Sequence, residues 1–332
     1  MFIFSIIIPV YNTKIEYFKR CLKSIKCNYL NINEFEVIII DDGNDDFNPY
    51  QKLINKYLKS IHTIVINNNL NLKQGYCRYL GLCESQGHYV HFVDSDDEIH
   101  PQIYTILKDY LNNDPDFVLF MEKMISNKIV QLDQEEILKS LINTTNLNLK
   151  NKMFSQKDLK KLRGHLTVVL HSKVFNRKWL LNTKSWTPNL YFEDALLSTE
   201  ILIKTKKFKM SYNKLYYYHF NSLSTLNSPP TMKFITDSII VFTNALKMLY
   251  NANKWELRYC IIDNILEVYG FNIDVLKDYY PLIMKIFDGY NVNFKFFNEK
   301  QYSWFKSNEK LFKLFYPLIS EHTCDIVKKN EL

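Results

Sequence analysis

Three aspartates stand close together between an apolar run and a proline. The stretch YVHFVDSDDEIHP (89–101) places Asp94, Asp96 and Asp97 after the run and Pro101 at its end. If the run is a strand that stops there and the chain turns, Asp94 and Asp96 can both reach one hard cation, because side chains at i and i+2 share a face. Mg²⁺ or Mn²⁺ suits these oxygens and would neutralise a departing diphosphate. Alternatively, the acids cap a helix that Pro101 opens, and the motif alone does not decide.

The elements that would position these acids follow from the hydrophobic pattern. Short runs of β-branched and aromatic residues predict strands over 4–11, 35–42, 62–68 and 89–96. Apolar residues three and four apart predict helices over 14–25, 50–61 and 74–85. This alternation indicates an α/β fold with a mostly parallel sheet flanked by helices. A ligand crevice in such a sheet lies beyond the carboxyl ends of the strands, where the chain places Tyr11-Asn12, Asp41-Asp42 and Asp94-Ser95-Asp96.

The rest of the chain is less regular. A helix is predicted over 101–113 and a strand over 116–122, followed by loops or short helices over 126–165. A second structured stretch carries segments 167–175, 191–205 and 209–220. Because Ser228-Pro229-Pro230 interrupts the chain and helical spacing resumes at Thr231, we predict one domain over 1–226 and an α-helical region over 227–332.

The formal charge of +7 is compatible with nucleic acid, an acidic membrane surface or a phosphorylated ligand. Basic runs at 160–163, 204–209 and 327–330 are predicted to be solvated faces. No nucleic-acid partner is expected, because a phosphate-binding face should not be lined with ordered acids. A Mg²⁺ phosphohydrolase is also disfavoured, since its motif continues to Thr or Val where this chain has Glu98.

Location is predicted to be cytoplasmic. No apolar run approaches the roughly 18 residues that span a bilayer, and no cleavable signal opens the chain. The helical region after 226 is predicted to pack on the core or a partner, with peripheral contact to the inner face of an anionic membrane as the alternative. Six cysteines without a C-x-x-C pair are predicted to be packing residues in a reducing compartment: Cys21, Cys27, Cys77, Cys83, Cys260 and Cys324.

Five motifs in one order resemble the family 2 glycosyltransferases. They are SIIIPVYN (5–12), EVIIIDDGNDD (36–46), NLKQGYCRYLGL (71–82), GHYVHFVDSDD (87–97) and FED (192–194). The resemblance covers roughly residues 3 to 225 and implies a GT-A-type, Rossmann-like fold, with the helical region as a C-terminal appendage. It also implies a nucleotide-diphosphate sugar as donor.

The resemblance assigns residues of the nucleotide pocket. Its wall is formed by Pro9, Tyr11 and Asn12, and Asp42 accepts a hydrogen bond from the base, with Gly43 permitting the turn. A carboxylate can accept from a pyrimidine imide N–H, and a UDP-sugar is favoured. The alternative for this stretch is a type I turn with solvated acids.

The resemblance also covers the phosphate side. Arg78 matches the arginine of the family's Ala-Arg-Asn motif, although Cys77 and Tyr79 depart from it, and its guanidinium pairs with phosphate or with the acidic cluster. Asp94 and Ser95 are assigned to the donor, and Asp94 and Asp96 to the metal. Lys73 stands where a glycine is common, and an exposed side chain is favoured over a phosphate contact.

Inverting transfer needs a base on the face opposite the leaving diphosphate. Glu193-Asp194 matches the family's Glu-Asp motif, which makes Asp194 the base and Glu193 its support or a contact to the acceptor. Two acids in the first turn of a helix are the plain structural alternative. His219, where an arginine is frequent, is assigned to the metal or diphosphate, against the alternative of a packed, hydrogen-bonded histidine.

These assignments predict an inverting, metal-dependent glycosyltransferase. It would move a sugar to a hydroxyl of a glycan or lipid-linked glycan during synthesis of a bacterial surface polysaccharide such as capsule or lipopolysaccharide. The alternative is a catalytically silent nucleotide-sugar or glycan-binding module on the same fold, which a donor hydrolysis assay would separate from an enzyme.

Overall fold

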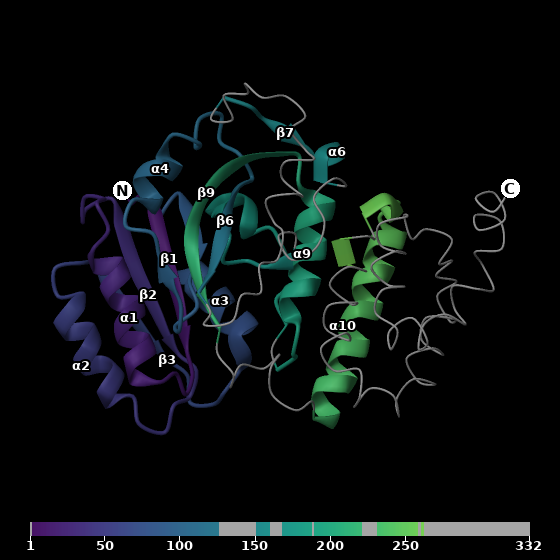
Figure 1. Cartoon of the computed structure of the whole chain (residues 1–332). Helices are drawn as coiled ribbons and strands as arrows, with labels where there is room; N and C mark the ends of the chain where they lie inside the picture. Colours follow the sequence, from purple (N-terminus) through teal and green to yellow (C-terminus); the bar gives the residue numbers. More distant parts are fainter. Residues whose placement is uncertain are drawn as a thin grey trace, which may run out of the picture.

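A single mixed sheet of nine strands forms the centre of the protein (Figure 1). The computed structural model describes residues 2–125, 151–159, 168–187, 189–220, 231–257 and 260–261, and all structural statements refer to these. The strand order is β3-β2-β1-β4-β8-β6-β9-β5, and β7 pairs with β9. Helices cover the sheet, so the predicted α/β class is confirmed.

The first half of the sheet is parallel, as predicted. It contains β1 (Phe4–Val10), β2 (Phe35–Asp41), β3 (Thr63–Asn67) and β4 (Tyr89–Phe92). β1 lies between β2 and β4, and all seven residues of β1 and of β2 are buried. Strands buried on both faces need continuous apolar runs, which explains why this half of the sheet could be predicted from the sequence.

The second half mixes directions. β8 (Lys173–Asn176) runs antiparallel to both β4 and β6 (Phe117–Ile125), while β6 runs parallel to β9 (Lys207–His219). The short strands β5 (Glu98–Ile99) and β7 (Phe154–Ser155) both pair antiparallel with β9. The sheet is therefore parallel only over its first four strands and between β6 and β9.

The helices follow the predicted spacing with shifted ends. In chain order they are α1 (Ile15–Lys26), α2 (Asn48–Tyr57), α3 (Lys73–Glu84), α4 (Ile103–Lys108), α6 (Gln156–Leu159), α8 (Arg177–Leu180), α9 (Glu193–Lys204), α10 (Met232–Asn251) and the 3₁₀ helix η1 (Trp255–Leu257).

The helix expected over 101–113 is much shorter than predicted. Pro101 lies in a turn, and α4 extends only from Ile103 to Lys108. After Lys108 the backbone N–H groups of Asp109 and Tyr110 bind the carbonyls three residues back, at Ile106 and Leu107, so the helix tightens and ends. At its start, the N-cap residue is Gln102, and no side chain caps the helix. The interpretation that the acids cap a helix opened by Pro101 is therefore wrong.

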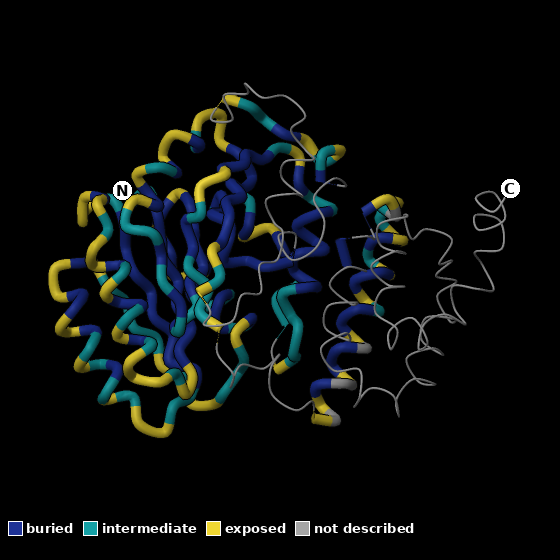
Figure 2. Tube along the Cα trace, viewed as in Figure 1, coloured by how far each residue is buried: buried dark blue, intermediate teal, exposed yellow. Residues whose placement is uncertain are grey.

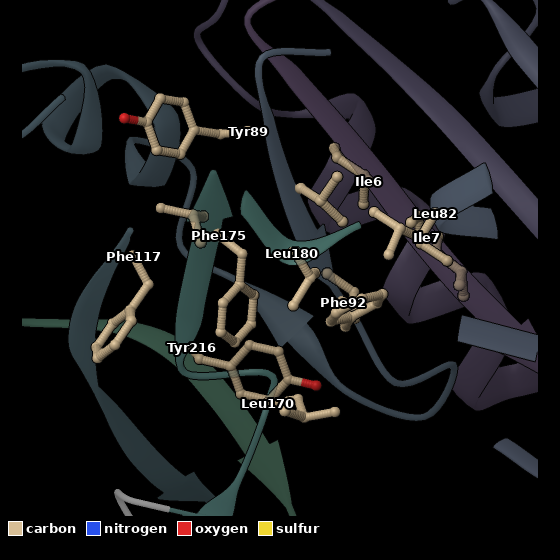
Figure 3. Close-up of a cluster of buried hydrophobic side chains, with 14 of the residues drawn as sticks. Ile6, Ile7, Leu82, Tyr89, Phe92, Phe117, Leu170, Phe175, Leu180 and Tyr216 are labelled. Atoms are coloured by element: carbon tan, nitrogen blue, oxygen red, sulfur yellow. The ribbon is translucent and has the colours of Figure 1, made fainter. Parts of the chain in front are cut away.

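Aromatic side chains join the two halves of the sheet. Figure 3 shows one from each of four strands: Phe92 of β4, Phe117 of β6, Phe175 of β8 and Tyr216 of β9. The Phe175 ring lies 6.0 Å from that of Phe92 and 6.1 Å from that of Phe117. Burying each such side chain contributes about 1.5–3 kcal/mol, so this cluster fixes β8 in the middle of the sheet.

The cysteines are only partly packing residues. Cys21, Cys77 and Cys260 are buried, as predicted, but Cys27 and Cys83 are exposed, contrary to the prediction. Cys27 follows the last residue of α1, and Cys83 belongs to the last turn of α3. Cys324 lies outside the described residues.

α10 packs directly on α9, on the side of α9 remote from β1 (Figure 1). Its buried residues Phe234, Val241, Phe242, Ala245, Leu246 and Leu249 belong to the same hydrophobic core as the sheet. Figure 2 shows the buried strands inside and exposed residues along the outer helices. The predicted packing on the core thus holds for α10, while the boundary near 226 stays a prediction. Among the described helices, none combines the length and hydropathy required to span a bilayer.

Candidate active site

Asp94 to Asp97, here called the acid turn, form the turn between β4 and β5. β4 ends at Phe92. The strand predicted over 89–96 is therefore too long, because Asp94 and Asp96 lie in the turn that follows the strand. The turn is closed by a hydrogen bond from Asp97 N to the Asp94 carbonyl (3.1 Å). The buried Asp97 carboxylate accepts from Tyr216 Oη (2.8 Å) and His219 N (2.7 Å). β9 therefore fixes the shape of the acid turn.

Negative charge is concentrated in the acid turn. Burial, followed by the charges of Asp96 and Asp94, raises the pKa of Asp97 well above its ordinary value. Within the described ranges, however, no group of three or more His, Cys, Asp or Glu side chains has the arrangement of a metal site. Asp94 and Asp96 carry carboxylate oxygens of the kind that Mg²⁺ and Mn²⁺ bind, and one or two carboxylates suffice for Mg²⁺ where phosphate and water complete its shell.

Asp94 is neutralised by two cationic side chains. Its Oδ1 accepts from Arg78 Nη2 (2.9 Å) and Gln74 Nε2 (2.5 Å), and Oδ2 lies 3.6 Å from His171 Nδ1. Burial would raise the pKa of Asp94, but Arg78 and His171 outweigh it and hold this pKa below its ordinary value. Asp94 is therefore an anion that organises its neighbours.

His171 is a site residue that the sequence did not reveal. It is buried between Asp94 and Glu122, whose Oε2 lies 2.6 Å from its Nε2, and it stacks on the ring of Tyr216 at 4.3 Å. Burial would lower the pKa of His171, but hydrogen bonds to Asp94 and Glu122 raise it to about 10. The site thus contains a buried imidazolium. A single histidine within VVLHSK belongs to no motif that would have indicated it.

Arg78 connects the acid turn to α9. Its Nη1 lies 3.5 Å from Glu193 Oε1, while Nη2 binds Asp94. Gly75 makes this approach possible, because a Cβ there would lie 2.2 Å from Glu193 Cγ. Burial and the charge of Asp194 raise the pKa of Glu193 to about 7, although Arg78 opposes the shift. Residues from three distant parts of the sequence therefore meet at one guanidinium.

Glu193 and Asp194 occupy the first turn of α9, where the helix dipole favours acids. The preceding Phe192 is left-handed (φ 61°), a conformation that costs a non-glycine residue about 1–2 kcal/mol. Lys173, also missed from the sequence, is buried nearby. Burial lowers its pKa to about 7, against the charges of Glu122 and Asp194.

The predicted wall of the nucleotide pocket follows β1. Pro9 is buried within the strand, and Tyr11 follows it with 46% of its surface exposed, so its ring is free to contact a base. Asn12 is left-handed (φ 48°) and donates from its backbone N to Asn44 Oδ1 (2.7 Å). The geometry leaves the nucleotide role of these residues a prediction.

Asp42 holds the start of α3. It is buried, and its oxygens accept from the backbone N of Leu72 (2.7 Å) and Lys73 (3.1 Å). Its hydrogen bond to a base stays a prediction, but the alternative of solvated acids does not describe it. Gly43 has φ 77°, as expected for a turn glycine. Lys73 is half-buried, with Nζ 5.3 Å from the Tyr191 ring centre, so the expected exposed side chain is wrong.

Ser95 belongs to the acid turn, and His219 at the end of β9 binds this turn through its backbone N. Buried Ser95 shares a 2.6 Å hydrogen bond with Thr13. The His219 imidazole pairs with Glu98 Oε2 at 2.5 Å through Nε2. Burial, then the charge of Arg20, lowers the pKa of His219, although Glu98 opposes this. His219 is thus next to the acid turn and hydrogen-bonded, and its role as a metal ligand stays a prediction.

An α/β sheet with an acid turn after its central strand, linked through arginine to acids on a separate helix, defines a GT-A-type protein. The chain belongs to the family described as Glycosyl transferase family 2, whose model matches residues 5–182.

Similar proteins carry the names of glycosyltransferases. The chain is 24% identical to the cholesterol galactosyltransferase of Borreliella burgdorferi over 203 residues, 59% of this chain and 55% of that protein. It is 32% identical to the poly(ribitol-phosphate) beta-N-acetylglucosaminyltransferase TarS of Staphylococcus aureus over 100 residues, 30% of this chain and 17% of TarS. The matches therefore span about half or less of these relatives.

Two solved structures show the same fold. Residues 1–349 of S. aureus TarS in complex with UDP-GlcNAc superpose with a TM-score of 0.62 at 20% identity, covering 83% of this chain and 75% of that one. The mannosyltransferase PcManGT of Pyrobaculum calidifontis, in complex with GDP-Man and Mn²⁺, gives a TM-score of 0.52 at 11% identity over 96% of this chain and 87% of that one.

Proposed function

We propose that this protein is an inverting glycosyltransferase of bacterial surface polysaccharide synthesis, which moves a sugar from a nucleotide-diphosphate sugar to a hydroxyl of a glycan or lipid-linked glycan. The observation that carries the proposal is the Arg78 bridge between Asp94 and Glu193. It brings the residues assigned to the donor within reach of those assigned to the acceptor. A UDP-sugar is the favoured donor, supported by the UDP-GlcNAc complex of TarS.

Each side chain has a separate task in this proposal. Asp194 takes the proton of the acceptor hydroxyl, while Glu193, paired with Arg78, holds the first turn of α9 in place. Tyr11 packs against the base, and Asp42 accepts its hydrogen bond. Asp94 and Asp96, with His219, would hold a divalent ion, which when bound supplies positive charge beside the diphosphate. The Mn²⁺ complex of PcManGT supports this choice of ion.

A thermal-shift panel tests donor binding. Purified protein is heated with UDP-, GDP- and other nucleotide-sugars, each with Mn²⁺ and with excess chelator. A true donor raises the melting temperature in proportion to the logarithm of its concentration over its dissociation constant. No shift with any nucleotide-sugar would contradict the proposal. The donor identified is then incubated alone, since binding without hydrolysis or transfer would favour the silent binding module.

A further inference from the structure

α10 binds the loop that leads into α9. This loop, residues 189–192, ends immediately before Glu193. The buried Asp237 of α10 accepts a hydrogen bond from the backbone N of Tyr191 (3.0 Å). Lys233, one turn earlier, donates to both Asp237 Oδ2 (2.8 Å) and the Asn189 carbonyl (2.8 Å). Polar groups of α10 therefore hold this loop by its backbone.

Aromatic contacts strengthen the same junction. The ring of Phe192 lies 4.8 Å from that of Phe234 and 5.7 Å from that of Phe242, both on α10. Phe192 is left-handed (φ 61°) and precedes α9 without a side-chain cap. A non-glycine residue keeps such a conformation only where its surroundings determine it. Here those surroundings include two rings of α10.

The start of α3, next to the proposed nucleotide pocket, also binds the 189–192 loop. Asn189 N donates to the Leu72 carbonyl (3.1 Å), and Leu72 N in turn donates to Asp42 (2.7 Å). Lys73 and Lys233 both place their ammonium groups near the ring of Tyr191, at 5.3 and 5.8 Å. The 189–192 loop is thus clamped between the start of α3 and α10.

We propose that α10 is part of the catalytic apparatus and that Asp237 is a positioning residue, which sets the place of Glu193 and Asp194 through the backbone of Tyr191. The inference rests on the proposed role of Asp194 as base. Loss of the Asp237 acceptor frees the loop at Tyr191, and the first turn of α9 then shifts relative to Arg78. A shift of about 1 Å in a catalytic group can lower turnover by about 10²-fold.

Three variants of the full chain test this. Asp237→Ala removes the acceptor, Asp237→Asn retains a carbonyl oxygen without the charge, and Asn244→Ala truncates an exposed residue of the same helix as control. For Asp237→Ala we expect kcat to fall roughly 10- to 100-fold with unchanged donor affinity. For Asp237→Asn we expect a loss of less than about fivefold, since a neutral acceptor still binds. Asn244→Ala should stay within about twofold of the parent.

Hydrogen exchange gives a second readout that does not depend on turnover. Deuterium uptake in a peptide containing Tyr191 should increase in Asp237→Ala and change little in the other two variants. Unchanged uptake, or equal losses of kcat in the alanine and asparagine variants, would overturn the positioning role. If Asp194→Asn retains activity while uptake in Asp237→Ala rises, Asp194 is not the base, but α10 still holds the 189–192 loop. If Asp194→Asn is inactive and Asp237→Ala keeps its activity, the positioning role of Asp237 is refuted and the proposed base is not.

Discussion

A methyl group added to Gly75 should separate activity from stability. Its Cβ would lie 2.2 Å from Glu193 Cγ, which must move by about 1.2 Å to reach the 3.4 Å of ordinary contact. That displacement removes Glu193 from Arg78, whose ion pair at 3.5 Å is already long. Because a misplacement of about 1 Å can cost 10²-fold, Gly75→Ala should lower kcat by on the order of 10²-fold. Gly75 lies within α3, where alanine is otherwise the better helix former by about 1 kcal/mol.

The matched control is Gly81→Ala on the same helix. Its added Cβ would meet Ile7 Cγ2 at 2.4 Å and Ile40 Cδ1 at 2.9 Å, inside the core. Overpacking there costs about 1–3 kcal/mol, so this variant should melt at a lower temperature and lose little kcat in its folded fraction. Calorimetry and steady-state kinetics with a verified donor and acceptor measure both effects. If Gly75→Ala keeps more than about a third of the parental kcat, far outside a 10²-fold loss, the placement of Glu193 is not needed for turnover.

Three further predictions concern the carboxylates. Asp194→Asn should lower turnover by about 10²–10⁴-fold with nearly unchanged donor affinity, and retention of more than about a tenth of turnover would assign the base elsewhere. Isothermal titration should show that the parent protein binds a nucleotide diphosphate more tightly in Mn²⁺ than in excess chelator, and Asp96→Ala should abolish this difference. Equal affinity of the parent protein under both conditions would refute the proposed metal site. Burial raises the pKa of Glu193 from 4.5 to about 7, so the folded protein holds this proton more tightly than the unfolded chain does. The resulting contribution to the free energy of unfolding is complete below about pH 4.5 and is lost as the pH rises through about 7. The melting temperature of Glu193→Gln should therefore fall less between pH 5 and 8 than that of the parent, and parallel curves would refute the shift.

The parallel half of the fold could be predicted because its strands are continuous apolar runs. β1 and β2 are buried on both faces, which leaves a signal in the sequence independent of any partner. The direction of β8 left no such signal, since four residues reading KVFN suit either orientation. Its place between β4 and β6 depends on contacts of Phe175 with rings far along the chain.

The candidate site shows the same division. The positions of Asp94, Arg78 and Glu193 follow from motifs, and the structure brings them together at one guanidinium. His171 could not be found, because a single histidine becomes significant only when the fold places it between Asp94 and Glu122. The role of Gly75 could not be predicted either, because the side chain that leaves no room for a Cβ there, Glu193, belongs to another helix.

The acid turn also links the centre of the sheet to its far edge. It leaves β4, a central strand, and enters β5, which pairs with β9 at the sheet's edge. Its hydrogen bond between Tyr216 and Asp97 joins residues 119 positions apart, whereas β1 and β2 are neighbours in sequence. Contacts between residues so far apart in sequence form slowly, because loop closure must come first. During refolding, β1 and β2 should therefore pair before the acid turn is fixed on β9, so that the proposed donor site is completed late.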